Sequence, residues 1–210
     1  EKSLRLDSQH SESYFYLSFA LRGLNKFESS YENLEKAITF GMPRSTFLRE
    51  HEAFLLYEME KYEEALSAYY KVLQEKGKEA EPEEYVRPMY LLIDVFNKKE
   101  DAKILGQRLL AYHPESAMSY NLMGWAQLQS NNVKEAAKLL RKALEFDPTL
   151  PAIYFNLGNV YERQGALQSA EKFYERALEL AREKRDDGMQ MLSSKALTKV
   201  KNQLNPTSSP

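Results

Sequence analysis

The sequence reads Tyr-Asn-Leu-Met-Gly at residues 120–124 and Tyr-Phe-Asn-Leu-Gly at residues 154–158, which begin 34 residues apart. The same interval separates Pro114 from Pro148 and Ala143 from Ala177. Residues 117–150 therefore align with residues 151–184 without a gap. A fixed period of this length indicates a repeat protein, in which each repeat is one supersecondary unit that stacks on its neighbours.

Three weaker copies of the pattern precede these two. The first copy carries Ser30 where the others carry Ala65, Ala102, Ala136 and Ala170. We therefore predict five repeats, at residues 11–44, 46–79, 83–116, 117–150 and 151–184. The largest insertion between repeats is expected in the charged segment 78–84.

Each repeat divides into two stretches with helical periodicity. In the fifth, Tyr154, Leu157, Gly158 and Tyr161 recur at the spacing of one helix face, and Gln164-Gly165 interrupts the pattern before the second stretch. Small residues such as Gly158 and Ala170 would let the two helices approach closely. The pattern predicts an all-α protein built of helical hairpins.

The segments outside the repeats receive separate predictions. Residues 185–204 place Met189, Leu192, Ala196, Val200 and Leu204 at spacings of 3 and 4, which predicts a helix that caps the last repeat. Residues 1–10 are expected to form a short arm, and residues 205–210 a disordered tail.

The fifth repeat resembles the tetratricopeptide repeat (TPR) family through Tyr154, Leu157, Gly158, Tyr161, Ala170, Tyr174 and Ala177. The resemblance extends over residues 11–184 and is most specific in the last two repeats. It implies a right-handed superhelix, or α-solenoid, of about five helix-turn-helix repeats with a C-terminal capping helix. It also implies a scaffold or adaptor that binds a protein or peptide partner.

In that family the first helix of each repeat lines a concave groove. The resemblance therefore implies a partner-binding groove lined by Phe15, Phe19, Phe54, Tyr57, Arg87, Asn121, Trp125, Gln129, Phe155, Asn159 and Arg163. It also places Arg22, Phe47, Glu50, Leu91, Asp94 and Glu162 at groove positions. Aromatic side chains would bury apolar groups of the partner, and Asn121 and Asn159 would hydrogen-bond its backbone. An ordinary packing role is the alternative for Phe15, Phe19 and Phe54.

Composition and motifs offer little for catalysis. The chain has no Cys, which excludes a disulfide or a Cys-ligated zinc site, and its three His residues lie far apart in sequence. No phosphate-binding loop or nucleophile elbow occurs. We therefore predict no enzyme activity, no catalytic or metal site and no cofactor.

Charge and hydropathy limit the partners. The net charge of −2 argues against nucleic acid as a partner and against a strong field at the groove, and no apolar run is long enough to insert into a membrane. We expect a soluble protein, cytoplasmic or, if a signal segment has been removed, periplasmic or otherwise extracytoplasmic.

Two further functions remain open beside the adaptor. One is a self-assembling TPR scaffold, which would be a homo-oligomer. The other is the TPR recruiting region of a larger enzyme or of a cell-envelope assembly complex. A clamp for acidic chaperone tails is not expected, because its cations are missing at Met118, Asn121, Ala152 and Phe155.

Overall fold

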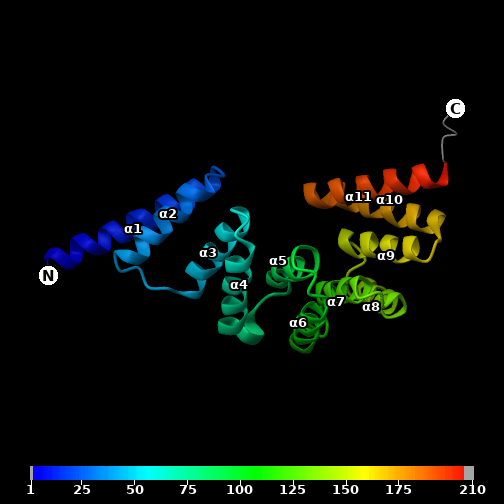
Figure 1. Ribbon diagram of the computed structural model, residues 1–210, viewed down its shortest axis with the longest axis horizontal. Helices are drawn as coiled ribbons and strands as arrows, with labels where there is room; N and C mark the ends of the chain where they lie inside the picture. The colour runs from blue at the N-terminus through cyan, green and yellow to red at the C-terminus, as the bar shows by residue number, and fades with distance from the viewer. Residues whose placement is uncertain (1, 206–210) are drawn as a thin grey trace. The chain divides into compact units, whose positions relative to one another are not determined.

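The computed structural model describes the backbone of residues 2–205 and the side chains of residues 10–205. All regular secondary structure in this part of the chain is helical, as the repeat predicted (Figure 1). The chain forms two compact units, residues 1–84 and residues 85–210. They are called the N-terminal unit and the C-terminal unit below.

The N-terminal unit contains two helical hairpins, formed by α1 (Lys2–Gly23) with α2 (Phe27–Thr39) and by α3 (Thr46–Glu58) with α4 (Tyr62–Lys76). Two 3₁₀ turns follow, η1 (Gly77–Glu79) and η2 (Pro82–Tyr85), in the segment where an insertion was expected. Residues 2–10 are the first turns of α1, not a separate arm. No Pro or Gly interrupts the helix there. Of the predicted tail at 205–210, residues 206–210 lie outside the described residues.

The C-terminal unit continues the hairpins. In chain order its helices are α5 (Val86–Tyr90), the π-helical η3 (Leu91–Val95), α6 (Lys99–Tyr112), α7 (Ala117–Gln129), α8 (Val133–Phe146), α9 (Pro151–Arg163), α10 (Leu167–Lys184) and α11 (Asp187–Leu204). The predicted first residues of the second, fourth and fifth repeats coincide with the starts of α3, α7 and α9.

Capping residues set several of these starts. The Ser45 and Ser116 hydroxyls each accept a hydrogen bond of 3.3 Å from the amide three residues on, and the Asp186 carboxylate accepts one of 2.9 Å from Met189. Pro151 begins α9, where its missing N–H costs nothing. Such caps satisfy amides that have no partner inside the helix.

Each hairpin turns through one residue in the left-handed region. These residues are Asn25, Glu60, Asn97, Asn131 and Gly165, with φ between 54° and 75°. They are separated by 35, 37, 34 and 34 residues, the intervals between the predicted starts of the five repeats. Gly and Asn adopt this conformation most readily. The turns thus give a register for all five repeats, including the first three, where the sequence pattern is weak.

Glycine allows the close helix contacts of the last two repeats. A Cβ atom added to Gly158 would lie 2.5 Å from the ring of Tyr174, and one added to Gly124 would lie 2.8 Å from the side chain of Leu140. Tyr174 and Leu140 are fully buried. The second helix of each hairpin therefore packs directly on the backbone of the first.

Helix α11 covers α10 and part of α9. Val200 is buried with Ala170 and Tyr174, as expected for a capping helix. Ala196 and Leu204 of the predicted apolar stripe also pack there, but Leu192 departs from it: Leu192 is 43% exposed, whereas Ser193 is buried. Residues spaced by repeated steps of four drift around a helix of 3.6 residues per turn, so one stripe cannot face the core along the whole length of α11.

Candidate functional site

All the predicted groove residues lie on the first helix of a hairpin. Within the N-terminal unit they include Phe15 and Phe19 on α1 and Phe47, Phe54 and Tyr57 on α3. Within the C-terminal unit they include Arg87 on α5, Asn121, Trp125 and Gln129 on α7, and Phe155, Asn159 and Arg163 on α9. The two sets belong to different compact units, so each set forms a surface of its own.

Four rings form a contiguous aromatic cluster in the N-terminal unit: Phe15, Tyr16, Phe19 and Phe47. Phe19 stacks on Phe47 with ring centroids 5.4 Å apart and planes 3° apart. Phe15 lies 5.0 Å from Phe19, 5.5 Å from Tyr16 and 6.2 Å from Phe47. Tyr16 is 68% exposed and Phe47 56%, so the cluster presents ring surface to solvent.

A buried polar network contacts the aromatic cluster through Phe19. Phe19 stacks on the imidazole of His51 at 3.9 Å, and His51 is itself buried. The His51 Nε2 atom lies 2.8 Å from the hydroxyl of Ser18, and Nδ1 lies 3.3 Å from the Arg22 guanidinium. Ser18 in turn donates to the carbonyl oxygen of Ser30 at 2.8 Å. The network joins α1, α2 and α3 and fixes the rings above it.

The network requires a neutral imidazole. The guanidinium of Arg22 can only donate a hydrogen bond, so Nδ1 of His51 must accept it. The single ring proton of the neutral imidazole therefore lies on Nε2 and is directed at the hydroxyl of Ser18. Burial, and then the positive charge of Arg22, lower the pKa of His51 from its ordinary value to about 4. His51 is therefore uncharged at neutral pH and acts as a structural link.

The remaining predicted aromatics of this unit are packed more deeply. Phe54 lies against the core formed by Leu34, Leu48 and Leu55, and the Arg22 guanidinium covers its ring at 3.8 Å. Tyr57 contacts Tyr62 edge to face at 5.9 Å. Phe15 also contacts the core with part of its surface. The packing alternative thus describes Phe54 and part of Phe15, whereas Phe47 remains open to solvent.

In the C-terminal unit, Asn121 lies in the protein interior, contrary to the prediction. Its side-chain oxygen accepts a hydrogen bond of 2.9 Å from Asn156, and both residues are buried. The Asn side chain provides a donor and an acceptor that the neighbouring repeat completes. Asn121 therefore joins α7 to α9 and is not available to a partner.

Other predicted residues of this unit are engaged in hydrogen bonds at its surface. Arg163 donates to the backbone oxygen of Leu128 and, at 2.9 Å, to the side-chain oxygen of Gln129. Asn159 accepts a hydrogen bond of 2.8 Å from the Tyr174 hydroxyl. Hydrogen bonding between side chains of adjacent helices thus holds much of this surface in one conformation.

Tyr174 connects this surface to the capping helix. Its hydroxyl also donates to the Glu162 carboxylate at 2.8 Å, and Glu162 forms an ion pair with Lys199 of α11. Burial, and then the Glu162 carboxylate, raise the pKa of Tyr174 above its ordinary value. Phe155 contacts the Tyr174 ring at 5.7 Å, and Phe155 and Trp125 are each partly exposed.

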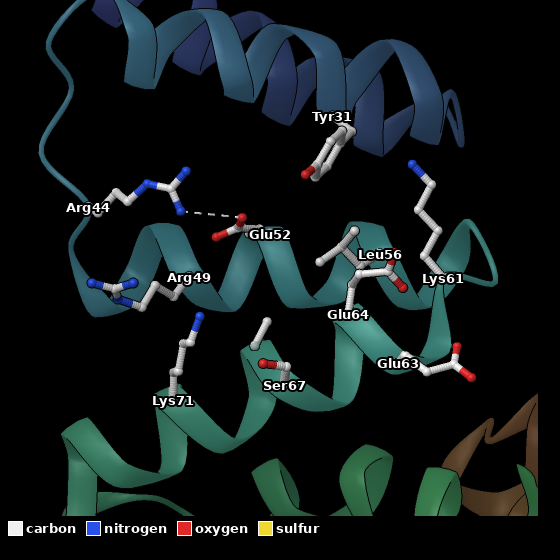
Figure 2. A pocket seen from close by; sticks show the side chains of 11 residues that line it. Tyr31, Arg44, Arg49, Glu52, Leu56, Lys61, Glu63, Glu64, Ser67 and Lys71 are labelled. Atoms are coloured by element: carbon white, nitrogen blue, oxygen red, sulfur yellow. Dashed lines mark ion pairs between the residues drawn. The ribbon is translucent and has the colours of Figure 1, made fainter. Parts of the chain in front are cut away.

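A cavity of about 440 Å³ lies elsewhere in the N-terminal unit, among α2, α3 and α4 (Figure 2). It is lined by Tyr31, Arg44, Arg49, Glu52, Leu56, Lys61, Glu63, Glu64, Ser67, Ala68 and Lys71. Arg44 points at Glu52, 3.5 Å away, and Lys61 lies 5.3 Å from the centre of the Tyr31 ring. The lining contains four cationic side chains and three carboxylates, so its positive and negative charges largely cancel. The charge of the lining therefore favours neither an anionic nor a cationic ligand. None of the predicted groove residues lines it.

Sequence reasoning missed two features of the aromatic surface. Tyr16 was not among the predicted residues, although it follows Phe15 and lies one turn before Phe19 and Ala20. The network of Ser18, Ser30 and His51 was also missed. Ser30 was visible as the Ser at a position where the other repeats have Ala, and Ser18 holds the position of Gly124 and Gly158.

Neither a metal cluster nor a membrane span is found among the described residues. No three or more His, Asp or Glu side chains of residues 10–205 gather where they could hold a metal ion. No helix within residues 2–205 combines the length and the apolar character needed to cross a bilayer.

The sequence matches two family models in its C-terminal unit. Residues 126–165 match a family described as "TPR repeat", and residues 151–184 match one described as "Tetratricopeptide repeat". No curated protein matches the sequence.

Solved structures share the fold at low sequence identity. A thermophilic TPR protein of Thermus thermophilus, TTC0263, is 17% identical with a TM-score of 0.66, covering 90% of this chain and 99% of its own. MamA from Desulfovibrio magneticus is 18% identical with a TM-score of 0.65, covering 85% and 97%. YrrB, described as a TPR protein with an unusual peptide-binding site, is 17% identical with a TM-score of 0.59, covering 93% and 95%. At this identity the likeness concerns the fold alone.

Proposed function

Since this chain is a tetratricopeptide repeat protein with an all-α solenoid fold, we propose that it is a non-catalytic adaptor that binds a segment of another protein on its first-helix surfaces. TPR repeats serve generally as protein-interaction modules. One structural relative, YrrB, is described as having a peptide-binding site. These relationships support the general role, and the surfaces of this chain support a more specific one.

The observation that carries the proposal is the exposed aromatic cluster of the N-terminal unit. Phe47 and Tyr16 are each more than half exposed although they belong to apolar or amphipathic residue types. Aromatic side chains are enriched where proteins bind partners, because they bury a large area and lose little conformational freedom. The Ser18–His51–Arg22 network holds the rings in place before any partner arrives, which lowers the entropic cost of binding.

The C-terminal unit offers a second, more polar surface for the partner. Trp125 and Phe155 are partly exposed, and Gln129, Asn159 and Arg163 lie on the same two helices. Because Arg163 and Gln129 already bond to each other, this surface would contribute a fixed pattern of polar groups. Asn121 is left out of the proposed site because it is buried.

Selection from a displayed library of random peptides would test this function. The wild-type protein should enrich peptides that lose binding to the variant Phe47→Ala. The control variant is Phe40→Ala, because Phe40 is 43% exposed in the same unit but stacks on Tyr14, apart from the cluster. Absence of any enriched peptide, or equal binding by wild type and Phe47→Ala, would contradict the adaptor role.

A second candidate function is self-association, which two exposed leucines in and directly after α1 favour. Leu17 of α1 is 46% exposed, and Leu24, in the turn that follows α1, is 66% exposed. Leu17 holds the repeat position of Leu157, which is buried against the preceding repeat. A second copy of the chain could cover these two leucines. Sedimentation velocity should then show a dimer that the double variant Leu17→Ser/Leu24→Ser disrupts, and a monomer at every concentration would exclude it.

A further inference from the structure

The two compact units carry opposite charge. Residues 1–84 contain 11 Lys and Arg against 17 Asp and Glu, a formal charge of −6, whereas residues 85–210 contain 18 against 14, a formal charge of +4. The net charge of −2 conceals this division. The aromatic cluster therefore belongs to a strongly acidic unit, although the whole chain is nearly neutral.

Carboxylates flank the cluster on both of its helices. Glu12 is exposed on α1, one turn before Tyr16, and has no ion-pair partner among the described side chains. Glu50 follows Phe47 by one turn on α3 and shares Lys76 with Glu84. Glu12 and Glu50 thus place one carboxylate on each helix of the cluster, and Glu50 shares its ammonium partner Lys76 with Glu84.

Arg22, on the same helix as Phe15 and Phe19, is already engaged. Arg22 covers the ring of Phe54 at 3.8 Å and bonds to His51 from the same guanidinium. Its guanidinium is therefore held between Phe54 and His51.

Two other aromatic rings of this unit already lie beside cations. Lys36 lies 5.7 Å from the centre of the Tyr14 ring, and Lys61 lies 5.3 Å from that of Tyr31. The negative face of an aromatic ring attracts a cation at such distances. Within the cluster, Tyr16 and Phe47 are more than half exposed, so their rings are open to a cation supplied by a partner.

We propose that the aromatic cluster binds a basic, apolar segment of the partner, with Lys or Arg side chains over Phe47 and Tyr16 and toward Glu12, and aliphatic side chains against Phe15 and Phe19. The inference rests on the proposed adaptor function and specifies the chemistry of its ligand. The field of the acidic unit attracts such a segment from a distance, and the rings and Glu12 hold it on contact. An acidic segment would meet repulsion at the same surface.

Fluorescence anisotropy with three matched peptides tests the charge preference. All three carry Leu on one face of an amphipathic helix, and the other face carries Arg, Gln or Glu. The Arg peptide should bind at least about 10-fold more tightly than the Glu peptide near 0.05 M salt, and the difference should shrink near 0.5 M, where the Debye length is only a few ångströms.

Variants of the full chain locate the binding. Phe47→Ala should weaken binding of the Arg peptide about 5-fold, as expected for loss of one cation–π contact with its buried area. Glu12→Lys should weaken the Arg peptide and strengthen the Glu peptide, which a merely structural role of Glu12 would not do. Phe40→Ala should bind as the wild type does. Circular dichroism should show that all three variants remain folded, because each changed side chain is exposed.

The outcomes separate the inference from the function on which it rests. Equal affinity for the Arg, Gln and Glu peptides, each weakened by Phe47→Ala, would overturn the charge preference and leave the adaptor function standing. A preference for proline-rich library peptides without basic residues would do the same. Failure of every peptide, combined with no enrichment from the random library, would contradict both.

Discussion

The first and fifth repeats bring their two helices together at the same pair of positions but use different residues there. In the fifth repeat the pair is Gly158 and Ala170, and the buried ring of Tyr174 packs against the glycine backbone. In the first repeat the pair is Ser18 and Ser30, whose hydroxyls lie 3.1 Å apart and donate to each other's backbone carbonyl oxygens. Small residues are required in both because of the close approach. A hydroxyl is tolerated only in the first, where each one has buried partners.

The contacts between adjacent repeats differ in a corresponding way. His51 of the second repeat bonds back to Ser18 of the first, and Asn156 of the fifth bonds back to Asn121 of the fourth. His51 and Asn156 occupy the same repeat position. Both units therefore use a buried hydrogen bond between first helices, but only the one in the N-terminal unit can change its charge with pH.

The largest effect is expected from removal of the ring that fills the fifth repeat. Tyr174→Ala should lower the free energy of unfolding by about 3–5 kcal/mol, because it leaves a cavity beside Gly158. Tyr174→Phe keeps the ring and loses the bonds to Asn159 and Glu162, so it should cost only about 1–2 kcal/mol. Urea unfolding, followed by the fluorescence of the chain's one Trp, measures both. A loss below about 1 kcal/mol for Tyr174→Ala would show that the Gly–Tyr contact is not what holds this hairpin together.

The second-largest effect is expected from acidification, which should weaken the contact between the first two repeats. The pKa of His51 is about 4 in the folded protein and near 6.5 in an unfolded chain, so the unfolded state takes up the proton first as the pH falls. The stability due to neutral His51 is complete above pH 6.5 and is lost between about pH 6.5 and pH 4, by roughly 3 kcal/mol in total. Denaturant unfolding of the wild type and of His51→Gln at several pH values isolates the part of the unfolding free energy that is due to His51. Identical pH dependence of the two proteins would exclude the role of His51.

Enlarging the glycine of the fifth repeat should have a smaller effect. Gly158→Ala gains helix propensity but forces Tyr174 to move, and we expect a net loss of about 1–3 kcal/mol. Gly188→Ala is the matched control in α11, where the added methyl group meets only Asp186 at 3.5 Å. The control should be neutral or stabilising by up to about 1 kcal/mol. Calorimetry of both variants gives the comparison, and a stabilised Gly158→Ala would mean that Tyr174 can move without cost.

The turns of the hairpins should show the smallest effects, of opposite sign in the two units. Glu60 has φ 58° in the turn of the second repeat, where three other repeats have Asn. Glu60→Asn should therefore stabilise the protein by about 0.5 kcal/mol. Gly165→Ala, at the same position of the fifth repeat, should destabilise it by about 1 kcal/mol although the space around Gly165 is open. Thermal unfolding that gave both changes the same sign would contradict the strain argument.

The helices and their pairing were largely predictable because they depend on local pattern. The 34-residue period placed the starts of α3, α7 and α9 at the residue where each begins. Residues 2–10 were predicted as a short arm but form the first turns of α1, because a helix can extend beyond the repeat pattern where no Pro or Gly ends it. Leu192 of α11 is exposed, contrary to the predicted stripe, because the five apolar residues of that stripe do not share one narrow face.

The surface residues were less predictable. Repeat position placed Phe47 and Asn121 equally on the first helix, yet Phe47 is 56% exposed and Asn121 only 3%. Their difference depends on the neighbouring repeat: Asn156 approaches Asn121 from α9, whereas the ring of Phe47 is contacted by Phe19 and Phe15 and stays more than half exposed. A single sequence contains no information on such distances.

The sequence alone determined that the chain is a stack of helical hairpins, because periodicity and small residues such as Gly158 act through neighbours three, four and 34 positions away. Only the tertiary structure decided which polar groups are buried together, as in the Ser18–His51 pair, and which rings remain exposed. It also divided the chain at residue 84, which separates an acidic unit from a basic one. Burial and electrostatic fields depend on every group nearby in space, and the order of residues along the chain does not specify that proximity.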